Sequence, residues 1–330
     1  MLSCKVTFLP SGITYTAKPG TTILQAAIEA GLYIDAPCGG NGLCGGCGVH
    51  IVTDGKEEFA LACETTVSDG MVVMLSAAEG HEILESGIET KFEIKSVVRR
   101  DETGAVFFDD TKLGMSDKDK PICAIAFDIG TTTVVGYLLN LETGETLSTV
   151  STLNPQSKFG ADVISRANYA IQNGGEILAS TIRKALTDLI HEAAEEAGIS
   201  KDQIFLVTVV GNTCMHHLFL GLPTNSLVLA PYKPAVVDPQ RLRAVAYDLD
   251  VHENAQLLVL QNISGFVGAD TVGGILSSAI DREEPMTLLI DIGTNGEMVL
   301  GNRNRLCACS TAAGPAFEGA KISIGMRGAK

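Results

Sequence analysis

Several features that would assign this chain to common protein classes are missing from it. It has no apolar run of about eighteen residues, so no membrane-spanning helix is predicted. The opening stretch Met1–Phe8 is too short and too strand-like for a secretory signal. The pattern G-x-x-x-x-G-K-[ST] does not occur, which excludes a P-loop. The chain has nine cysteines, and this odd number fits poorly with a framework of disulfides. We therefore expect the protein to reside in the reducing cytoplasm.

Positive charge is also scarce. The formal net charge is −15, and residues 1–80 hold three Lys and no Arg against eight Asp plus Glu. A nucleic-acid partner is not expected, because its phosphate backbone would be repelled by this region. By default the acid excess only keeps the protein in solution. It would also allow the region to dock on a basic patch of a redox partner.

The most informative stretch is a cysteine loop. Cys38, Cys44 and Cys47 are separated by five and two residues, and Cys63 follows. Six of the eleven residues from Cys38 to Gly48 are glycine, as expected where backbone N–H groups approach sulfur. Four thiolates are the usual complement of a [2Fe–2S] cluster. A structural zinc site is the alternative, but zinc usually takes two close ligand pairs and only Cys44 and Cys47 form one.

The elements around this loop predict a small domain over residues 1–80. Residues 5–9 and 13–17 alternate as a hairpin, 23–30 form a helix, and 49–53 and 71–75 are strands. This β-grasp plan, an α+β fold, resembles the [2Fe–2S] ferredoxin domains. The five-residue first gap departs from the plant pattern, which has four.

The rest of the chain is predicted as α/β structure. We interpret residues 81–120, with their mixed charges, as a linker with a solvated surface. Residues 121–210 form a first lobe, and residues 211–330 begin a second. Within them we expect buried strands at 122–127 and 204–210 and helices at 161–172 and 176–197.

The tetrapeptide Asp-Ile-Gly-Thr occurs twice, at Asp128 and at Asp291, each time after an apolar strand and before a hairpin. The copies lie 163 residues apart (291 − 128), which indicates two related lobes. A tight turn with exposed N–H groups and short hydroxyls can accept phosphate, and its aspartate can hold Mg²⁺ through water or position a nucleophile. The candidate residues are Asp128, Gly130, Thr131, Thr132, Thr133, Asp291, Gly293, Thr294 and Asn295.

Cys214, His216 and His217 also have metal-ligating side chains. Adjacent histidines on a helix point about 100° apart, which makes them a poor chelating pair. We therefore expect packing or a lobe-interface role for them.

The paired turns resemble the phosphate-1 and phosphate-2 loops of the acetate kinase, sugar kinase, heat-shock chaperone and actin superfamily. That resemblance implies two ribonuclease-H-like lobes that close over ATP with Mg²⁺. It also implies a nucleotide contact at Gly314, in the stretch Thr311–Gly319.

An iron–sulfur β-grasp domain, a linker and an actin-like core, in that order, resemble the reductive activators of corrinoid proteins. The resemblance implies ATP-dependent reduction of a corrinoid from Co(II) to Co(I), with the electron relayed by the cluster at Cys38, Cys44, Cys47 and Cys63. It implies a corrinoid iron–sulfur or corrinoid methyltransferase protein as partner and a low-potential electron donor, and it leaves a homodimer open.

The superfamily's adenosine segment lies well beyond its phosphate-2 loop, whereas this sequence ends 39 residues after Asp291. We therefore expect an incomplete second lobe, which belongs either to a fragment of a longer protein or to a natural truncation with impaired ATP binding, and we favour the fragment. Two other functions stay open. One is a plain electron-transfer protein with an ATPase-like docking scaffold, and the other is a redox-linked small-molecule kinase.

Overall fold

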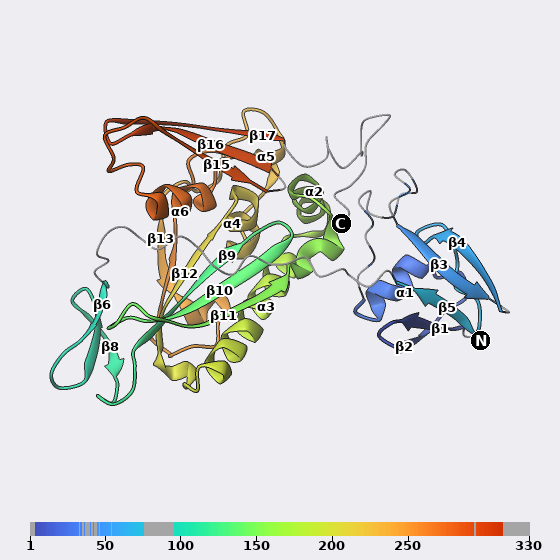
Figure 1. Ribbon diagram of the computed structural model, residues 1–330, viewed down its shortest axis with the longest axis horizontal. Helices are drawn as coiled ribbons and strands as arrows, with labels where there is room; N and C mark the ends of the chain where they lie inside the picture. The colour runs from blue at the N-terminus through green and yellow to red at the C-terminus, as the bar shows by residue number, and fades with distance from the viewer. Residues whose placement is uncertain are drawn as a thin grey trace. The chain divides into compact units, whose positions relative to one another are not determined.

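The computed structural model describes residues 4–75, apart from 33, 35, 37–39, 41, 43, 44, 46 and 54, and residues 96–312, apart from 294. The chain divides into two compact units (Figure 1). The smaller contains residues 1–82 with 158–162, and the larger contains 83–157 with 163–330. No described helix is both long and apolar enough to cross a membrane.

The smaller unit has the predicted β-grasp fold. Its five-stranded sheet has the order β2-β1-β5-β3-β4, with β1 antiparallel to β2 and parallel to β5. The elements are β1 (Cys4–Leu9), β2 (Ile13–Ala17), α1 (Ile23–Glu29), β3 (Gly48–Thr53), β4 (Lys56–Leu61) and β5 (Met71–Met74). Of these elements, only β4 was not predicted from the sequence, because its side chains are exposed along most of its length.

Helix α1 forms where its local signals place it. The Thr22 hydroxyl accepts the Gln25 N–H at 3.2 Å, which satisfies one of the donors that a helix start leaves open. Its apolar stripe, Ile23, Leu24, Ala26 and Ala27, is buried in the core of the unit. Burying these side chains holds the helix on the sheet next to the segment that carries the cysteines.

The larger unit is built on a six-stranded sheet of order β11-β10-β9-β12-β14-β13. Strands β9, β10 and β11 are antiparallel neighbours, and β12 and β14 join β9 in parallel. This is the arrangement expected of a ribonuclease-H-like lobe. The strands are β9 (Cys123–Ile129), β10 (Thr133–Asn140), β11 (Thr146–Leu153), β12 (Ile204–Gly211), β13 (Gln240–Arg243) and β14 (Gln256–Val259).

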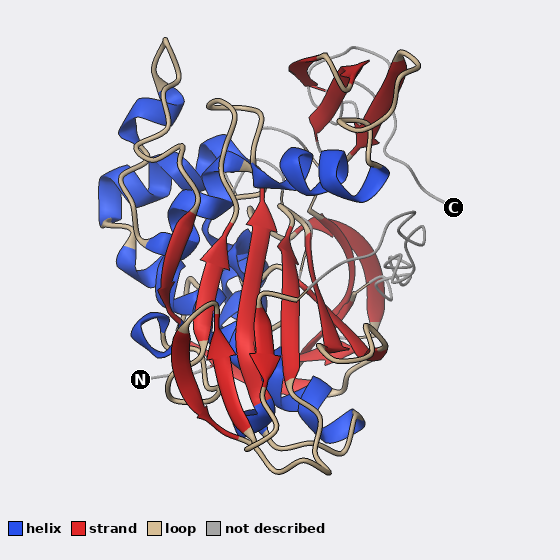
Figure 2. Ribbon diagram, turned by 90° about the vertical axis from the view of Figure 1, so that its left-hand side faces the viewer, coloured by secondary structure: helices blue, strands red, loops and turns tan. Residues whose placement is uncertain are grey.

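Helices pack beside this sheet (Figure 2). Helix α3 contacts β10 and β11, α4 contacts α3 and β12, and α2 contacts α4 and α5. Their bounds are α2 (Val163–Asn173), α3 (Glu176–Glu196), α4 (Thr213–Leu220) and α5 (Asn225–Val228). Ile182, Leu186 and Leu189 are buried at helical spacing, so α3 faces the sheet with an apolar stripe. The sequence pattern also predicted Ile177 in this stripe, but Ile177 is exposed and Leu178 is buried instead.

The second copy of the repeat forms its own sheet. Strands β15 (Thr287–Ile292), β16 (Asn295–Asn302) and β17 (Arg305–Ala312) are antiparallel neighbours, as β9, β10 and β11 are. Helix α6 (Ala269–Ser278) contacts both β12 and β15, and Ile275 packs with Ile280 and Val299. The internal repeat predicted from sequence is thus a structural repeat of two three-stranded meanders.

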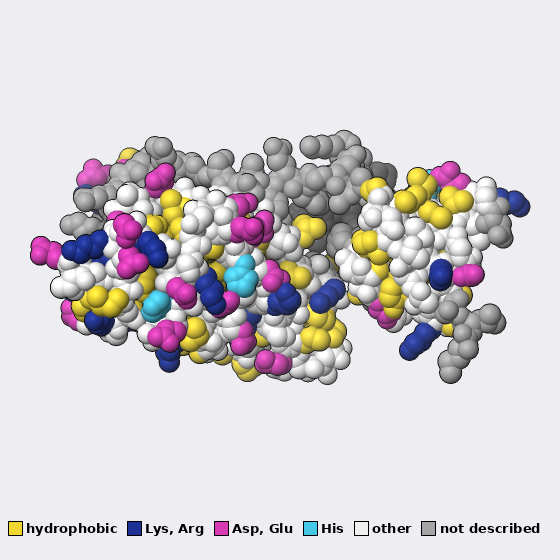
Figure 3. Space-filling model, turned by 90° about the horizontal axis from the view of Figure 1, so that it is seen from below, with side chains coloured by type: hydrophobic (Ala, Val, Ile, Leu, Met, Phe, Trp, Pro, Cys, Tyr) yellow, Lys and Arg dark blue, Asp and Glu magenta, His cyan; other side chains and the backbone are white. Residues whose placement is uncertain are grey.

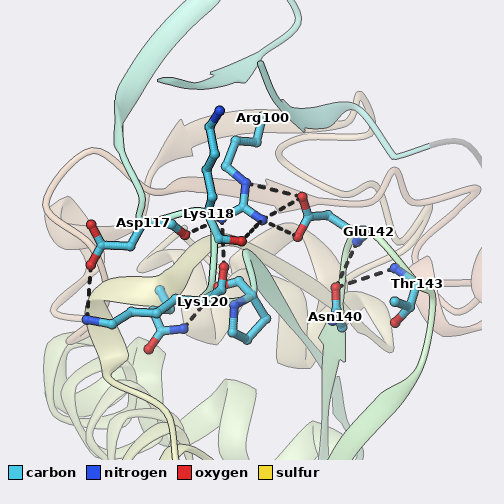
Figure 4. Close-up of polar contacts among 9 residues, drawn as sticks. Arg100, Asp117, Lys118, Lys120, Asn140, Glu142 and Thr143 are labelled. Atoms are coloured by element: carbon cyan, nitrogen blue, oxygen red, sulfur yellow. Dashed lines mark hydrogen bonds and ion pairs between the residues drawn. The ribbon is translucent and has the colours of Figure 1, made fainter. Parts of the chain in front are cut away.

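Residues 98–115 form a fourth sheet, within the larger unit, and Arg100 ties it to neighbouring loops (Figure 4). Its strands are β6 (Val98–Arg100), β7 (Ala105–Phe108) and β8 (Thr111–Met115). The guanidinium of Arg100 bonds the Glu142 carboxylate at 2.7 and 2.8 Å and also donates to the carbonyls of Asp117, Lys118 and Lys120. The expectation of a solvated surface is therefore wrong at Arg100, whose side chain is nearly buried.

Charged side chains are mixed over the surface. Figure 3 shows acidic and basic groups intermingled on the visible face of the larger unit. Exposed ion pairs also occur in this unit, such as Lys184 with Asp188 and Arg241 with Asp109. On this face the net negative charge is thus dispersed and does not form a single acidic patch.

Candidate functional site

In the smaller unit, two of the four predicted cluster ligands are described. The Sγ atoms of Cys47 and Cys63 lie 3.2 Å apart, and the Cys63 N–H points to the Cys47 Sγ at 3.4 Å. A disulfide would need about 2.05 Å, so the two sulfurs are not bonded to each other. Two thiolates this close can bind one iron ion, and a backbone N–H directed at sulfur is typical of iron–sulfur sites.

The glycine-rich backbone of the loop also suits a cluster. Gly40, Gly42 and Gly45 have φ angles of 83°, 69° and 66°, the left-handed region that side chains with a Cβ avoid. Cys38 and Cys44 lie outside the described residues. Where the loop is described, its residues fit a [2Fe–2S] group, and the full set of four ligands stays a prediction.

In the larger unit, the first Asp-Ile-Gly-Thr turn joins β9 to β10. Asp128 is exposed at the end of β9, and Thr131 is buried with its Oγ1 accepting a hydrogen bond from Asn212 Nδ2 at 3.0 Å. Thr132 is exposed and Thr133 is half-buried. At Gly130 an added Cβ would lie 2.8 Å from the Thr133 carbonyl oxygen, so the turn itself requires a residue without a side chain.

Close backbone packing brings further elements to this turn. Gly211 ends β12 opposite Ile129, and a Cβ on it would lie 2.7 Å from the Ile129 carbonyl oxygen. Gly268 precedes α6, and a Cβ there would lie 2.6 Å from the Thr213 backbone nitrogen. Because both positions are glycine, the starts of α4 and α6 can lie beside the end of β9.

Four carboxylates gather around the paired turns, from Asp128, Asp270, Asp291 and Glu297. Although Asp128 is accessible to solvent, desolvation by the surrounding protein, with Asp270 and Asp291 nearby, raises its pKa to about 6. Burial raises the pKa of Asp270 and of Glu297, and Asp291 adds to both effects. A nearby cation would relieve this repulsion, although among the described residues these carboxylates do not form a group that could ligate a metal ion directly.

The second turn is more open than the first. Asp291 and Gly293 are exposed, and Asn295 is half-buried at the start of β16. Asp291 pairs across the strands with Glu297, which accepts a hydrogen bond from the Ser310 hydroxyl at 2.9 Å. Thr294 and Gly314 lie outside the described residues, and their predicted contacts remain predictions.

Asp270 and Glu297 were not among the predicted site residues. Asp270 follows a Gly-rich turn into a helix, and such an aspartate is equally consistent with a capping role. In the structure it accepts the Thr271 N–H at 2.7 Å and also interacts with Asp128 and Asp291. One feature of the sequence could have indicated Glu297 as a site residue. It follows Asp291 by six residues, which places it in the paired strand of a short hairpin.

A small hollow borders the site. Its described lining is largely apolar and contains no charged residue, with Asn212 and Asn295 contributing amides. The apolar lining comes from Val163, Ile164, Ala167, Leu227, Val228 and Phe266. Such walls offer no counter-charge to a phosphate, so the anion-binding capacity lies in the turns.

The two histidines of α4 have packing roles. His217 uses both ring nitrogens, because Nδ1 lies 2.7 Å from the Thr213 carbonyl and Nε2 accepts the Ala235 N–H at 2.8 Å. His216 is buried, and burial together with His217 lowers its pKa to about 4. No group of three or more His, Cys, Asp or Glu suited to a metal ion occurs among the described residues.

Comparison with known domain families accounts for both units. Residues 6–68 match the 2Fe-2S iron-sulfur cluster binding domain. Residues 123–283 match the RACo middle region, and residues 285–330 match the C-terminal domain of RACo, the ASKHA domain. The chain thus combines a 2Fe-2S domain with matches to the middle region and the C-terminal domain of RACo. The predicted family resemblance, the fold and the [2Fe–2S] cofactor are confirmed.

Similar proteins carry names of the same kind. The chain is 31% identical, over 93% of its length, to "Corrinoid activation enzyme RamQ" of Eubacterium limosum. It is 28% identical, over 61% of its length, to "[Co(II) methylated amine-specific corrinoid protein] reductase" of Methanosarcina barkeri. A solved structure, "Reductive activator for corrinoid,iron-sulfur protein", superposes on 99% of the chain with a TM-score of 0.65 and 28% identity.

These relatives are longer than the chain. It spans 60% of the Eubacterium protein, 38% of the Methanosarcina protein and 66% of the solved activator.

Proposed function

We propose that this chain serves the ATP-dependent reductive activation of a corrinoid protein. One electron passes to Co(II), which becomes Co(I), and ATP is hydrolysed to ADP and phosphate to drive the step. The observation that carries the proposal is the presence, in one chain, of an iron–sulfur domain and of two Asp-Ile-Gly-Thr turns whose carboxylates interact. Neither a simple ferredoxin nor a simple kinase needs both.

In the smaller unit, Cys38, Cys44, Cys47 and Cys63 would hold the cluster. A [2Fe–2S] group supplies a one-electron redox centre when bound. The polypeptide contributes the thiolates, the Cys63 N–H directed at Cys47, and a backbone that glycine allows to fold tightly around the site. Hydrogen bonds to sulfur and burial of Cys47 are the means by which this chain tunes the potential.

In the larger unit, the turns would bind the phosphates of ATP and Asp128 would hold Mg²⁺ through water. The hydroxyls of Thr131, Thr132 and Thr133 are donors placed on one turn, and Asn295 supplies an amide from the other. Desolvation, with Asp270 and Asp291 nearby, raises the pKa of Asp128 to about 6, so a divalent cation beside it would relieve repulsion. Asp291 and Asp270 would orient the hydrated ion or the attacking water.

The partner would be a corrinoid protein. The Eubacterium and Methanosarcina relatives and the solved activator are each named for acting on one. The solved activator is named for a corrinoid iron–sulfur protein and the Methanosarcina relative for a methylated amine-specific corrinoid protein, so both kinds of protein are substrates to be tested. A low-potential donor would reload the cluster, and a homodimer stays an open arrangement.

The deciding experiment is Asp128→Ala, assayed by the loss of the Co(II) signal in electron paramagnetic resonance. Each corrinoid partner is supplied with reductant and Mg·ATP. We expect the rate to fall about 100-fold or more, as for loss of a group that stabilises developing charge. Asp119→Ala, at an exposed position on the same unit, is the matched control and should leave the rate unchanged.

An unchanged rate in Asp128→Ala would refute the ATP-dependent function and favour the plain electron-transfer protein. Cys63→Ser separates the two halves of the proposal. It should abolish corrinoid reduction and visible iron–sulfur absorbance while Mg·ATP still binds.

A further inference from the structure

Two asparagines, the buried Asn154 and the partly buried Asn212, hold the first Asp-Ile-Gly-Thr turn in shape. Asn154 has no exposed surface and follows directly after β11. Its backbone N–H donates to the Thr132 carbonyl at 2.7 Å, and its Nδ2 donates to the Gly130 carbonyl at 2.7 Å. Its Oδ1 accepts the Gln156 N–H at 2.9 Å. Asn154 therefore bonds two carbonyls of the turn at once.

The second asparagine holds the turn from another side. Asn212 is the N-cap of α4, with its Oδ1 accepting the Met215 N–H at 3.0 Å while its Nδ2 donates to Thr131 Oγ1. Met215 joins the two, since its Sδ lies 3.6 Å from Asn154 Nδ2 and 3.5 Å from Arg166 Nη1. The turn is thus tied both to the end of β11 and to the start of α4.

These bonds determine where the turn's own donors point. In a trans peptide the carbonyl of one residue and the N–H of the next point in opposite directions. Fixing the carbonyls of Gly130 and Thr132 therefore fixes the amide directions of Thr131 and Thr133. Because Thr131 Oγ1 accepts from Asn212, its own hydroxyl proton remains able to donate elsewhere.

We infer that Asn154 and Asn212 are positioning residues for phosphate binding, which aim the amide and hydroxyl donors of the Asp128–Thr133 turn at the nucleotide. The inference rests on the proposed ATP-binding function of that turn. Neither asparagine needs to touch the ligand. Their effect is preorganisation, so that donors need not be reoriented when phosphate arrives.

The test is the affinity of the purified chain for Mg·ATP by titration calorimetry in Asn154→Asp and Asn212→Asp. In Asn154→Asp the amide that donates to the Gly130 carbonyl is replaced by a carboxylate, which has no proton to donate. Asn212→Asp keeps the N-cap acceptor for Met215 but accepts the Thr131 hydroxyl proton, which reverses that hydrogen bond. We expect each variant to bind Mg·ATP about tenfold more weakly or worse, which corresponds to the loss of one well-placed hydrogen bond.

Asn254→Asp is the matched control. It loses a comparable 2.9 Å bond, from Asn254 Nδ2 to the Leu113 carbonyl, at the opposite end of the sheet. Its melting temperature should fall as in the other two variants while its Mg·ATP affinity stays at the parental value. Should Asn154→Asp fold poorly, Asn212→Asp, whose helix cap is intact, decides the question alone.

The outcomes separate the two proposals. Parental affinity in both Asn154→Asp and Asn212→Asp would overturn the positioning role while leaving ATP binding in place. Equal weakening in Asn254→Asp would also overturn it, since the effect would then be general destabilisation. A parent chain that does not bind Mg·ATP would overturn both the inference and the ATP-dependent function.

Discussion

The two Asp-Ile-Gly-Thr turns share a sequence but differ in their surroundings. The first is enclosed, with Ile129 only 1% exposed, Thr131 buried and two asparagines bonded to it. In the second, Ile292 is 82% exposed and Gly293 has no described neighbour closer than 3.7 Å to an added Cβ. The same four residues therefore form a rigid turn in one lobe and an open one in the other. What surrounds the motif, and not the motif itself, provides the rigidity.

The largest expected difference between the turns concerns their isoleucines. Ile129→Ala should cost about 2–5 kcal/mol in the free energy of unfolding, because it leaves a cavity between β9 and its neighbours. Ile292→Ala should change the same quantity by less than about 0.5 kcal/mol, since the side chain is mostly in water. Urea denaturation of both variants measures this. Equal losses would mean that the second turn is as enclosed as the first.

A smaller contrast is expected at the glycines. Gly130→Ala would place a methyl group 2.8 Å from the Thr133 carbonyl oxygen and should destabilise the chain by about 1–3 kcal/mol. Gly293→Ala meets only an ordinary contact and should be neutral, or stabilise by up to about 1 kcal/mol by restricting the unfolded chain. The comparison fails if thermal melting ranks the two variants in the opposite order.

The smallest effect should be a pH dependence at Asp128, whose pKa of about 6 lies above its ordinary value of 3.8. A raised carboxyl pKa means that the folded state binds the proton more tightly than the unfolded state, so stability is lost as pH rises through about 6. Asp128→Asn should therefore melt higher than the parent above about pH 6.5 and equally below about pH 4. Asp270 and Asp291 are the charged groups that add to this shift, after the larger effect of desolvation.

Added Mg²⁺ provides the check on that prediction. A bound cation compensates the carboxylate repulsion in the parent, so the melting advantage of Asp128→Asn at high pH should shrink. An advantage that persists unchanged in Mg²⁺ would show that Asp128 does not help to hold the ion.

Local patterns were sufficient to predict most of the fold. The hairpin of β1 and β2, the Thr22 cap, the apolar stripe of α3 and the two meanders each depend on residues close together in sequence. Asn154 could not be recognised in this way, because a polar residue between a strand and a proline is typical of a turn. Its partner Gly130 lies 24 residues away. Arg100 was missed for the same reason, since Glu142 is 42 residues distant.

The sequence also predicted part of the candidate nucleotide site. Asp128 and Asp291 stood out because the motif repeats, whereas Asp270 occurs once and depends on the packing of α6 to reach them. The positions of the candidate ATP residues agree with a nucleotide site, and their roles remain proposals. Cys47 and Cys63 lie together as the spacing predicts, because β3 pairs with β4 and brings the two ends of that hairpin side by side.

Gly211 restricts which sequences can adopt the fold of this lobe. Its backbone pairs with Ile129 so closely that any Cβ would overlap the carbonyl oxygen, and Asn212 follows at once to cap α4 and hold Thr131. A chain that keeps the Asp-Ile-Gly-Thr tetrapeptide but has a larger residue in place of Gly211 cannot bring β12 this near to β9. In this chain the Gly-Asn pair at the end of β12 thus distinguishes the enclosed copy of the motif from the open one.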